Sequence, residues 1–106
     1  MYARIVTINL KPNRLSDFTE TLDKNVIPML RKQQGFKEQL ALARSNGTEI
    51  RTIGFWDSKE NADTYHGGTY PQVMKAFGDM IDGTPQVNQF EVVQSTYHKI
   101  PALATV

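Results

Sequence analysis

Two hydrophobic periods alternate along this chain, and their order limits the fold more than any other feature of the sequence. Strand patterns, alternating or rich in β-branched residues, occupy four segments: Tyr2–Leu10, Phe36–Arg44, Glu49–Trp56 and Val87–His98. Apolar residues spaced three and four apart predict one long helix over 13–33 and a pair of shorter helices over 58–82. This order, β-α-β-β-α-β, is typical of an α+β fold of the ferredoxin-like type, a four-stranded antiparallel sheet with its helices on one face.

Capping and breaking residues mark the expected ends of these elements. Asn13 is expected to cap the long helix, and Pro28 to loosen it near its end, because proline removes a backbone donor. Asp57 begins a segment with the spacing of a capping box and is expected to cap the next helix. The double glycine at 67–68 is expected to break that helix. Pro101 and the small residues after it predict a loose tail or an arm laid on a neighbouring chain.

The composition narrows the class of protein. The 106 residues include no cysteine, so neither a disulfide nor a thiolate metal site is expected, and apolar packing must hold the fold together. Twelve Lys and Arg against eleven Asp and Glu give a net charge of +1 with the signs scattered, which argues against a nucleic-acid partner. No apolar run is long enough for a membrane span, and neither a signal peptide nor a linker is evident. One cytoplasmic domain over residues 1–106 is therefore expected.

Both faces of the expected sheet carry apolar residues. In the first strand Val6 faces one side and Ile5 the other, and in the third strand Trp56 and Phe55 are opposed in the same way. An apolar sheet surface of this size exceeds what monomers usually expose. A homodimer packed sheet to sheet is therefore expected. The alternative is that the strand registers differ from those assumed.

A family resemblance lies in the segment that joins the third strand to the next helix. Residues 53–62 (IGFWDSKENA), followed by the Tyr-His pair at 65–66, resemble the antibiotic biosynthesis monooxygenase family: an aromatic residue ends the strand, an acidic/Ser-x-Glu-x-Ala helix begins, and a histidine follows. Residues 10–13, an amphipathic helix and then Gly-Phe at 35–36 look like the first half of that family. The resemblance covers residues 4–97 and implies a dimeric α/β barrel.

The resemblance also implies a reaction, a cofactor-independent monooxygenation of a small aromatic or quinol-type substrate. Enzymes of this kind need no metal or flavin, because the deprotonated substrate itself reduces dioxygen, so no cofactor is expected. The haem-degrading branch of the superfamily carries Asn, Trp and His at positions that fall near Val6, Tyr65 and Lys75, and none of the three matches. Haem degradation is therefore not expected.

Four residues form the candidate site. His66 is the expected proton acceptor, since histidine titrates near neutral pH and this one shares a helix face with Ala62. Trp56 at the end of the third strand, and Tyr65 and Tyr70 around the double glycine, are expected to bind the substrate and gate its cavity. Each has a structural alternative: His66 at a helix end, Trp56 in the core, and the two tyrosines packed at the surface.

Three functions are left open by the sequence. The first is the cofactor-independent monooxygenase. The alternative is a non-catalytic, small-ligand-binding or stress-related dimer that uses the same cavity to hold an aromatic molecule. Isomerase or mutarotase chemistry is a third, for which a second positioned acid is not evident. Oxygen consumption separates the first from the second.

Overall fold

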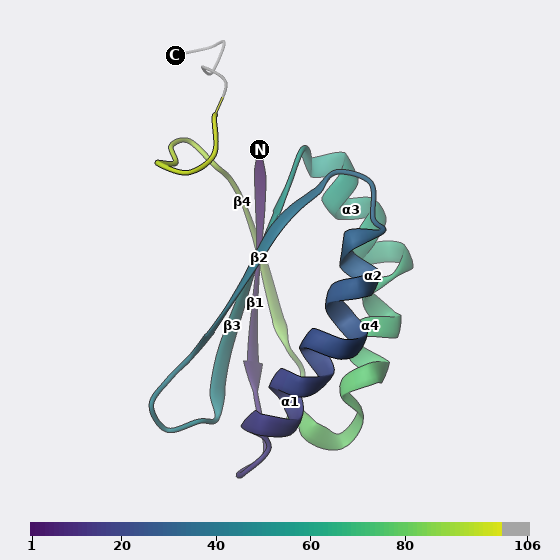
Figure 1. Ribbon diagram of the computed structural model, residues 1–106, viewed down its shortest axis with the longest axis vertical. Coiled ribbons are helices and arrows are strands. Elements are labelled where there is room, and N and C mark those ends of the chain that lie inside the picture. Colours follow the sequence, from purple (N-terminus) through teal and green to yellow (C-terminus); the bar gives the residue numbers. More distant parts are fainter. Residues whose placement is uncertain (101–106) are drawn as a thin grey trace.

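The computed structural model describes residues 1–100. Its four strands form one sheet: β1 (Tyr2–Asn9), β2 (Phe36–Ala43), β3 (Glu49–Trp56) and β4 (Gln86–Glu91). They lie in the order β2-β3-β1-β4, and each neighbouring pair is antiparallel. In this part of the chain the helices cover one face of the sheet and leave the other without a helix (Figure 1). The α+β, ferredoxin-like architecture is therefore confirmed.

Two helical runs form the second layer. The first consists of α1 (Leu15–Thr21), a π-helical turn (Leu22–Val26) and α2 (Ile27–Arg31); the second consists of α3 (Lys59–Gly68), α4 (Tyr70–Phe77) and a 3₁₀ turn (Gly78–Met80). Phe18 and Phe77 stack with their ring centroids 4.5 Å apart, so α1 and α4 are joined through the core. Gly78 ends α4 in a left-handed conformation that other residues rarely adopt.

The first helical run departs from regular α-helix just before its proline. Pro28 stands in the first turn of α2, where a backbone donor is not needed, and the π-helical turn precedes it. The expected cap is wrong. Asn13 has a φ of 64°, and Arg14 is the N-cap residue, without a side-chain hydrogen bond to the helix. Asparagine tolerates the left-handed region, so Asn13 turns the chain one position before the cap.

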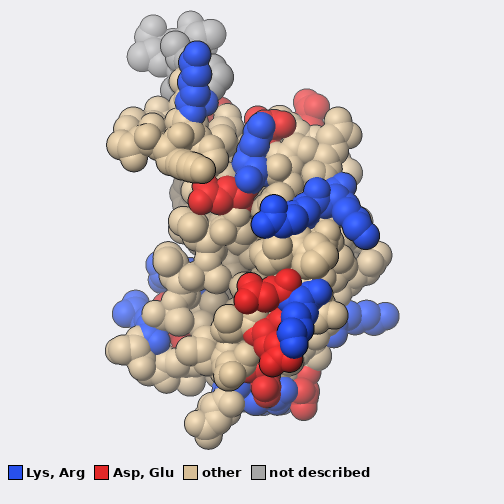
Figure 2. Space-filling view, viewed as in Figure 1, with Lys and Arg blue, Asp and Glu red and all other residues tan. Residues whose placement is uncertain are grey.

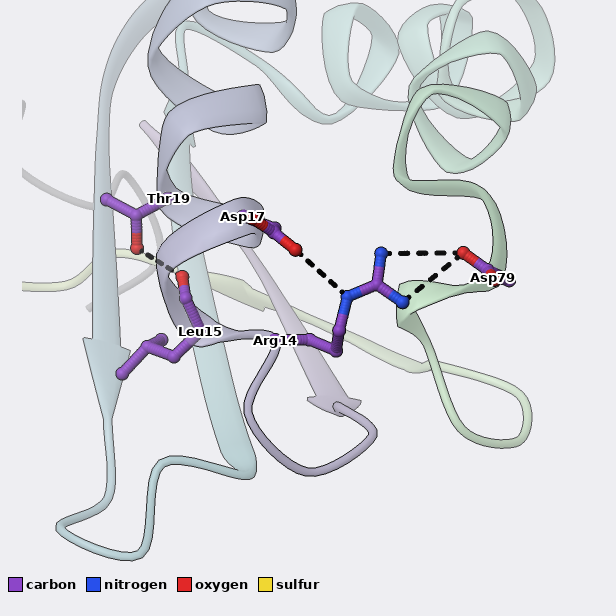
Figure 3. Close-up of polar contacts among 5 residues, drawn as sticks. All are labelled: Arg14, Leu15, Asp17, Thr19 and Asp79. Atoms are coloured by element: carbon purple, nitrogen blue, oxygen red, sulfur yellow. Dashed lines mark hydrogen bonds and ion pairs between the residues drawn. The ribbon is translucent and has the colours of Figure 1, made fainter.

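Arg14 links the beginning of α1 to the end of the second helical run (Figure 3). Its Nε donates to Asp17 Oδ2 at 3.1 Å, and its two terminal nitrogens lie 3.4 and 3.5 Å from Asp79 Oδ1. Both carboxylates are largely exposed, and surface pairs of this kind contribute little stability. The guanidinium therefore connects the two helical runs but contributes little to the stability of the fold.

Two expectations for α3 are wrong. Ser58, not Asp57, is the N-cap: its Oγ accepts a hydrogen bond from Asn61 N at 3.2 Å, while Asp57 pairs with Lys37 at 3.0 Å. The expected pair of helices is present, but its break lies after the double glycine at 67–68 rather than at it: α3 includes both glycines and ends at Gly68, and α4 begins at Tyr70. A glycine inside a helix costs only about 1 kcal/mol, so a helix can include it.

The last strand is shorter than predicted, ending at Glu91 rather than His98. Glu91 pairs with Tyr2, the first residue of β1, so the antiparallel strand β4 ends opposite the beginning of β1. The chain beyond it turns over the open face of the sheet, where His98 Nε2 lies 2.6 Å from Glu38 Oε1. The His98 ring packs 5.7 Å from that of Phe55. The predicted loose tail from Pro101 lies outside the described residues.

The two faces of the sheet differ in cover. The helix-covered face carries the core, in which the largest fully buried side chains are Trp56, Phe18, Ile8, Leu30, Ile50 and Val26. A β-bulge between Phe36 and Glu38 turns Phe36 toward this core, so that Leu40 and Leu42 face the other way. Leu40, Leu42 and Phe90 are 43%, 52% and 55% exposed on the open face. The apolar second face expected from the sequence is therefore present.

The surface over residues 1–100 has two further properties. None of the helices there combines the length and apolarity that a membrane crossing requires. Basic and acidic side chains are interspersed over the face shown in Figure 2, in agreement with a net charge of +1.

Candidate functional site

Arg4 is the least expected residue of the helix-covered face. It lies on β1 with the same parity as Val6 and Ile8, and only 4% of it is exposed. Among residues 1–100 no carboxylate lies within ion-pair distance of its guanidinium, and its Nε is buried without a hydrogen-bond partner. A buried charge in this condition is rare, because buried polar groups almost always find partners.

Two tyrosines flank this guanidinium. The Arg4 Cζ lies 4.1 Å from the ring centroid of Tyr70 and 5.2 Å from that of Tyr65, distances typical of cation–π contacts. The two rings lie 6.1 Å apart at an angle of 59°. Tyr65 comes from the last turns of α3 and Tyr70 from the first residue of α4, so the junction at Thr69 sets the spacing of both.

His66 closes the outer side of the site. Its Nδ1 lies 2.7 Å from an Arg4 terminal nitrogen, and its ring stacks on Tyr70 with centroids 5.3 Å apart at 19°. Because a guanidinium only donates hydrogen bonds, Nδ1 accepts here and the imidazole is neutral with its proton on Nε2. The rest of His66 is exposed. The ring therefore has one face on the site and one edge in solvent.

A small cavity lies beneath these side chains, between the sheet and both helical runs. Its polar lining consists of Arg4, Gln39, Thr52, Tyr65 and Tyr70, and its apolar lining comes mainly from Leu22, Val26, Val73, Met74 and Phe77. The volume is about 20 Å³, room for a single water molecule. An aromatic ring enters only if the half-buried side chains on its outer side move outward.

Gly54 stands between two residues of the cavity lining, Arg4 on β1 and Gln39 on β2, but does not line the cavity itself. A Cβ at this position would lie 3.3 Å from Trp56 Nε1 and 4.0 Å from the Arg4 carbonyl oxygen. The Trp56 indole therefore occupies the space over Gly54, and the glycine permits this close approach.

The π-helical turn borders the same cavity. Leu22 and Val26, its first and last residues, both line the cavity from the first helical run. A π turn widens the helix locally and is frequent at functional sites. This turn changes the direction of the apolar side chains at the point where the helix covers the polar residues of the sheet.

The tyrosine hydroxyl most deeply placed in the site stays protonated. Burial raises the pKa of Tyr65 to about 12, the positive charge of Arg4 opposes this rise, and Tyr70 adds to it. Burial likewise lowers the pKa of Arg4, although a guanidinium is basic enough to keep its charge. The site thus combines a charged Arg4 with a Tyr65 hydroxyl that keeps its proton.

The structure brings together three of the four residues expected from the sequence. His66, Tyr65 and Tyr70 gather around Arg4, whereas Trp56 lies behind Tyr65, with ring centroids 4.9 Å apart, and does not line the cavity. Arg4 is the residue that the sequence analysis missed. A signal for Arg4 was present, because a strand that places Val6 and Ile8 in the core places Arg4 there too.

Metal ligands are not grouped in the described part of the chain. Over residues 1–100, no three or more His, Cys, Asp or Glu side chains lie close enough to hold a metal ion.

Comparison with known proteins places this chain in a family. None of the curated proteins matches it. A solved structure of a candidate antibiotic biosynthesis monooxygenase from Bordetella bronchiseptica is similar in fold, with 18% sequence identity, a TM-score of 0.75, and an alignment that covers 88% of this chain and 97% of that one. A mutant form of SnoaB, a cofactor-independent oxygenase from Streptomyces nogalater, is also similar, with 12% identity, a TM-score of 0.73, and coverage of 92% of this chain and 97% of that one. The family model described as "Antibiotic biosynthesis monooxygenase" matches residues 1–77, and to that family the chain belongs.

Proposed function

We propose that this protein is a cofactor-independent monooxygenase that acts on a small aromatic or quinol-type substrate in the cavity between sheet and helices. The observation that carries the proposal is the contact between His66 Nδ1 and the buried Arg4, next to a largely apolar cavity that Tyr65, Tyr70 and Phe77 help to line. Family membership and the fold shared with SnoaB, a cofactor-independent oxygenase, support the same reaction class.

The reaction proposed here needs a proton acceptor more than it needs a redox group. A phenol, quinol or anthrone loses a proton, and the electron-rich anion then transfers electrons to dioxygen. When a ring methylene becomes a carbonyl, one oxygen atom of dioxygen forms the new bond to carbon and the other leaves as water with the two hydrogens. The protein supplies orientation, a dry site and the acceptor for the first proton.

His66 is the proposed proton acceptor. Its Nδ1 carries a lone pair that faces into the site and is occupied by an Arg4 N–H. A substrate hydroxyl that enters between the two takes the place of this contact and donates to Nδ1. The exposed edge of the imidazole then returns the proton to solvent, since His66 is otherwise open to water.

The aromatic residues are proposed to bind and admit the substrate. Tyr65 keeps its proton and can donate a hydrogen bond from its hydroxyl, because its pKa is raised to about 12 by burial. Tyr70, half-buried and stacked on His66, is the gate, and its movement outward opens the cavity to a ring. Trp56 supports Tyr65 from behind and holds its orientation.

We further propose that two copies associate through the open face of the sheet. Leu40, Leu42 and Phe90 lie exposed there, and a second sheet would remove them from water. The cavity lies on the opposite, helix-covered face, so each copy keeps its own site.

Oxygen uptake with a panel of quinols and anthrones tests the proposed reaction. We expect consumption with at least one member of the panel, and a rate at least about a hundredfold lower for His66→Ala, the usual contribution of a positioned general base. His98→Ala is the matched control, because the only other histidine packs against Glu38 on the open face.

The outcomes separate the two candidate functions. Equal rates in the wild-type protein and His66→Ala would remove His66 from the mechanism. Thermal stabilisation by these compounds with no oxygen uptake would instead establish the non-catalytic ligand-binding alternative.

A further inference from the structure

Arg4 is a fixed positive charge that the protein itself does not neutralise. Its guanidinium is buried, its Nε donor is unused, and among residues 1–100 it has no carboxylate partner. Removing a charge from water is expensive unless the charge is paired and hydrogen-bonded. A buried side chain of this kind indicates that a bound ligand supplies the negative charge.

The neighbours of Arg4 cannot supply the missing negative charge. His66 accepts a guanidinium hydrogen bond at Nδ1, and an imidazole that does so is neutral. Tyr65 has a pKa of about 12, so its hydroxyl keeps its proton at neutral pH. Gln39 and Thr52, which also line the cavity, carry no charge. No Asp or Glu belongs to this lining, and the buried Arg4 Nε has no hydrogen-bond partner among residues 1–100.

The Arg4 guanidinium borders the cavity together with two aromatic rings. The rings of Tyr65 and Tyr70 lie 5.2 and 4.1 Å from its Cζ on the helix side, and all three residues line the cavity. A planar guanidinium can present two parallel N–H groups to an oxyanion. Its unused Nε and a terminal nitrogen form such an edge once the contact to His66 is exchanged for the ligand.

We propose that Arg4 binds the ionised oxygen group of a small planar aromatic ligand, so that the site selects aromatic monoanions over neutral molecules of the same size. The proposal deepens the function proposed above and rests on it for the location of the substrate. Two kinds of ligand carry this oxyanion chemistry, phenolates and aromatic carboxylates, and both would place the charge on Arg4 and the ring in the cavity beside the two tyrosines.

Equilibrium binding of three matched nitroaromatic probes tests the proposal. The probes are 4-nitrophenolate, 4-nitrobenzoate and the neutral 4-nitrobenzyl alcohol, measured at a pH where the first two are ionised. We expect the wild-type protein to bind at least one anionic probe about tenfold or more tightly than the neutral probe, the usual gain from a charged hydrogen bond. Which of the two anions binds more tightly identifies the source of the oxyanion.

Arg4→Met is the decisive variant, because methionine fills a similar volume without charge. We expect it to lose the preference for anions and to bind the neutral probe as the wild-type protein does. Arg4→Lys keeps the charge but not the planar edge, so it should retain a smaller preference. Arg44→Met, on the exposed β-hairpin, is the matched control and should leave the selectivity unchanged.

A stability measurement shows whether Arg4→Met folds, so that a loss of binding is not mistaken for a loss of structure. Replacing an unpaired buried charge by an apolar side chain should leave the melting temperature of the ligand-free protein unchanged or higher. If Arg4→Met does not fold, Arg4 has an essential structural role and the proposal is overturned.

Failure of this proposal can be distinguished from failure of the proposed function. Equal binding of anionic and neutral probes, no binding of any probe, or unchanged selectivity in Arg4→Met each overturns the role of Arg4, while oxygen uptake with neutral quinols would keep the monooxygenase. Selective binding of anions without oxygen uptake would keep the role of Arg4 and remove the reaction.

Discussion

At the scale of single residues, the site depends on groups held in unusual protonation or charge states. Arg4 remains charged where burial disfavours charge, and Tyr65 remains protonated well above the range in which a free tyrosine ionises. Both effects have the same cause, because the helix-covered face excludes water from their polar groups. The charge of Arg4 and the protonation of Tyr65 therefore each affect the stability of the fold.

The raised pKa of Tyr65 predicts a loss of stability at alkaline pH. An unfolded tyrosine ionises near about pH 10, whereas in the folded chain the pKa is about 12. Between these values the folded chain holds more protons than the unfolded chain, so the free energy of unfolding falls as pH rises through this window and is unaffected by Tyr65 below it. The full effect is about 2–3 kcal/mol.

Urea unfolding across this pH window, compared between the wild-type protein and Tyr65→Phe, measures the effect. The stability of the wild-type protein relative to the variant should decline by about 2–3 kcal/mol as the pH rises from about 9 to 12. A constant difference between the two proteins would show that Tyr65 ionises at its ordinary pKa.

Residue-scale prediction from the sequence reached the aromatic part of the site but not its charge. Tyr65, Tyr70 and His66 stand close together in the sequence, and one helix junction brings them together. Arg4 is far from them in the sequence, and only the pairing of β1 with β3 places it beside Gly54. A residue contributed across the sheet depends on a register that one strand pattern does not define.

At the scale of elements, the beginning of α3 controls how its aromatic residues meet the sheet. Ser58 caps the helix through its Oγ and also bonds the Asn61 side chain at 2.9 Å. Asn61 packs where Gly35 has no side chain, since a Cβ on Gly35 would collide with the Asn61 side chain. This end of α3 is therefore fixed both along the helix and against the turn before β2.

Removal of the cap should be measurable in the stability of the whole protein. Ser58→Ala is expected to lower the free energy of unfolding by about 1 kcal/mol, the usual cost of losing a hydroxyl cap. Asp57→Ala is the matched control at the neighbouring position, where an exposed pair with Lys37 predicts a change of less than about 0.5 kcal/mol. Chemical denaturation of the three proteins measures both values. The reverse order would restore Asp57 as the cap.

Element boundaries were less predictable than the elements themselves. Asp57 and Ser58 are both good caps, and the choice between them depends on where Asn61 finds room beside Gly35. The end of β4 depends on the length of its neighbour β1, which no pattern within β4 records. Propensity alone placed the break at the double glycine, although each glycine costs a helix only about 1 kcal/mol and α3 includes both before it ends.

At the scale of the whole molecule, the order of strands and helices was predictable because it follows from two hydrophobic periods. The open apolar face was predictable for the same reason, as Ile5 and Val6 alternate across β1. The small size of the cavity was not, because it depends on how side chains from both helical runs fill the space over the sheet. The cytoplasmic location and the single domain over residues 1–106 stay predictions.

The proposed association of two copies predicts a change of mass on mutation of the open face. Light scattering of the wild-type protein at micromolar concentration should give the mass of two chains. Leu40→Lys replaces an exposed apolar residue of the open face by a charge and should give the mass of one chain. Thr64→Lys adds the same charge on exposed α3 and is the control that should leave the mass unchanged. A single-chain mass for the wild-type protein would contradict the proposal.

The segment that follows β4 has a consequence for any molecule that docks on this sheet. Because His98 lies on Phe55 and against Glu38, the chain covers part of its own open face before a partner arrives. Tyr97, which is 76% exposed, packs against the His98 ring in the same segment. The segment therefore restricts direct contact between two sheets to the part of the open face that carries Leu40, Leu42 and Phe90.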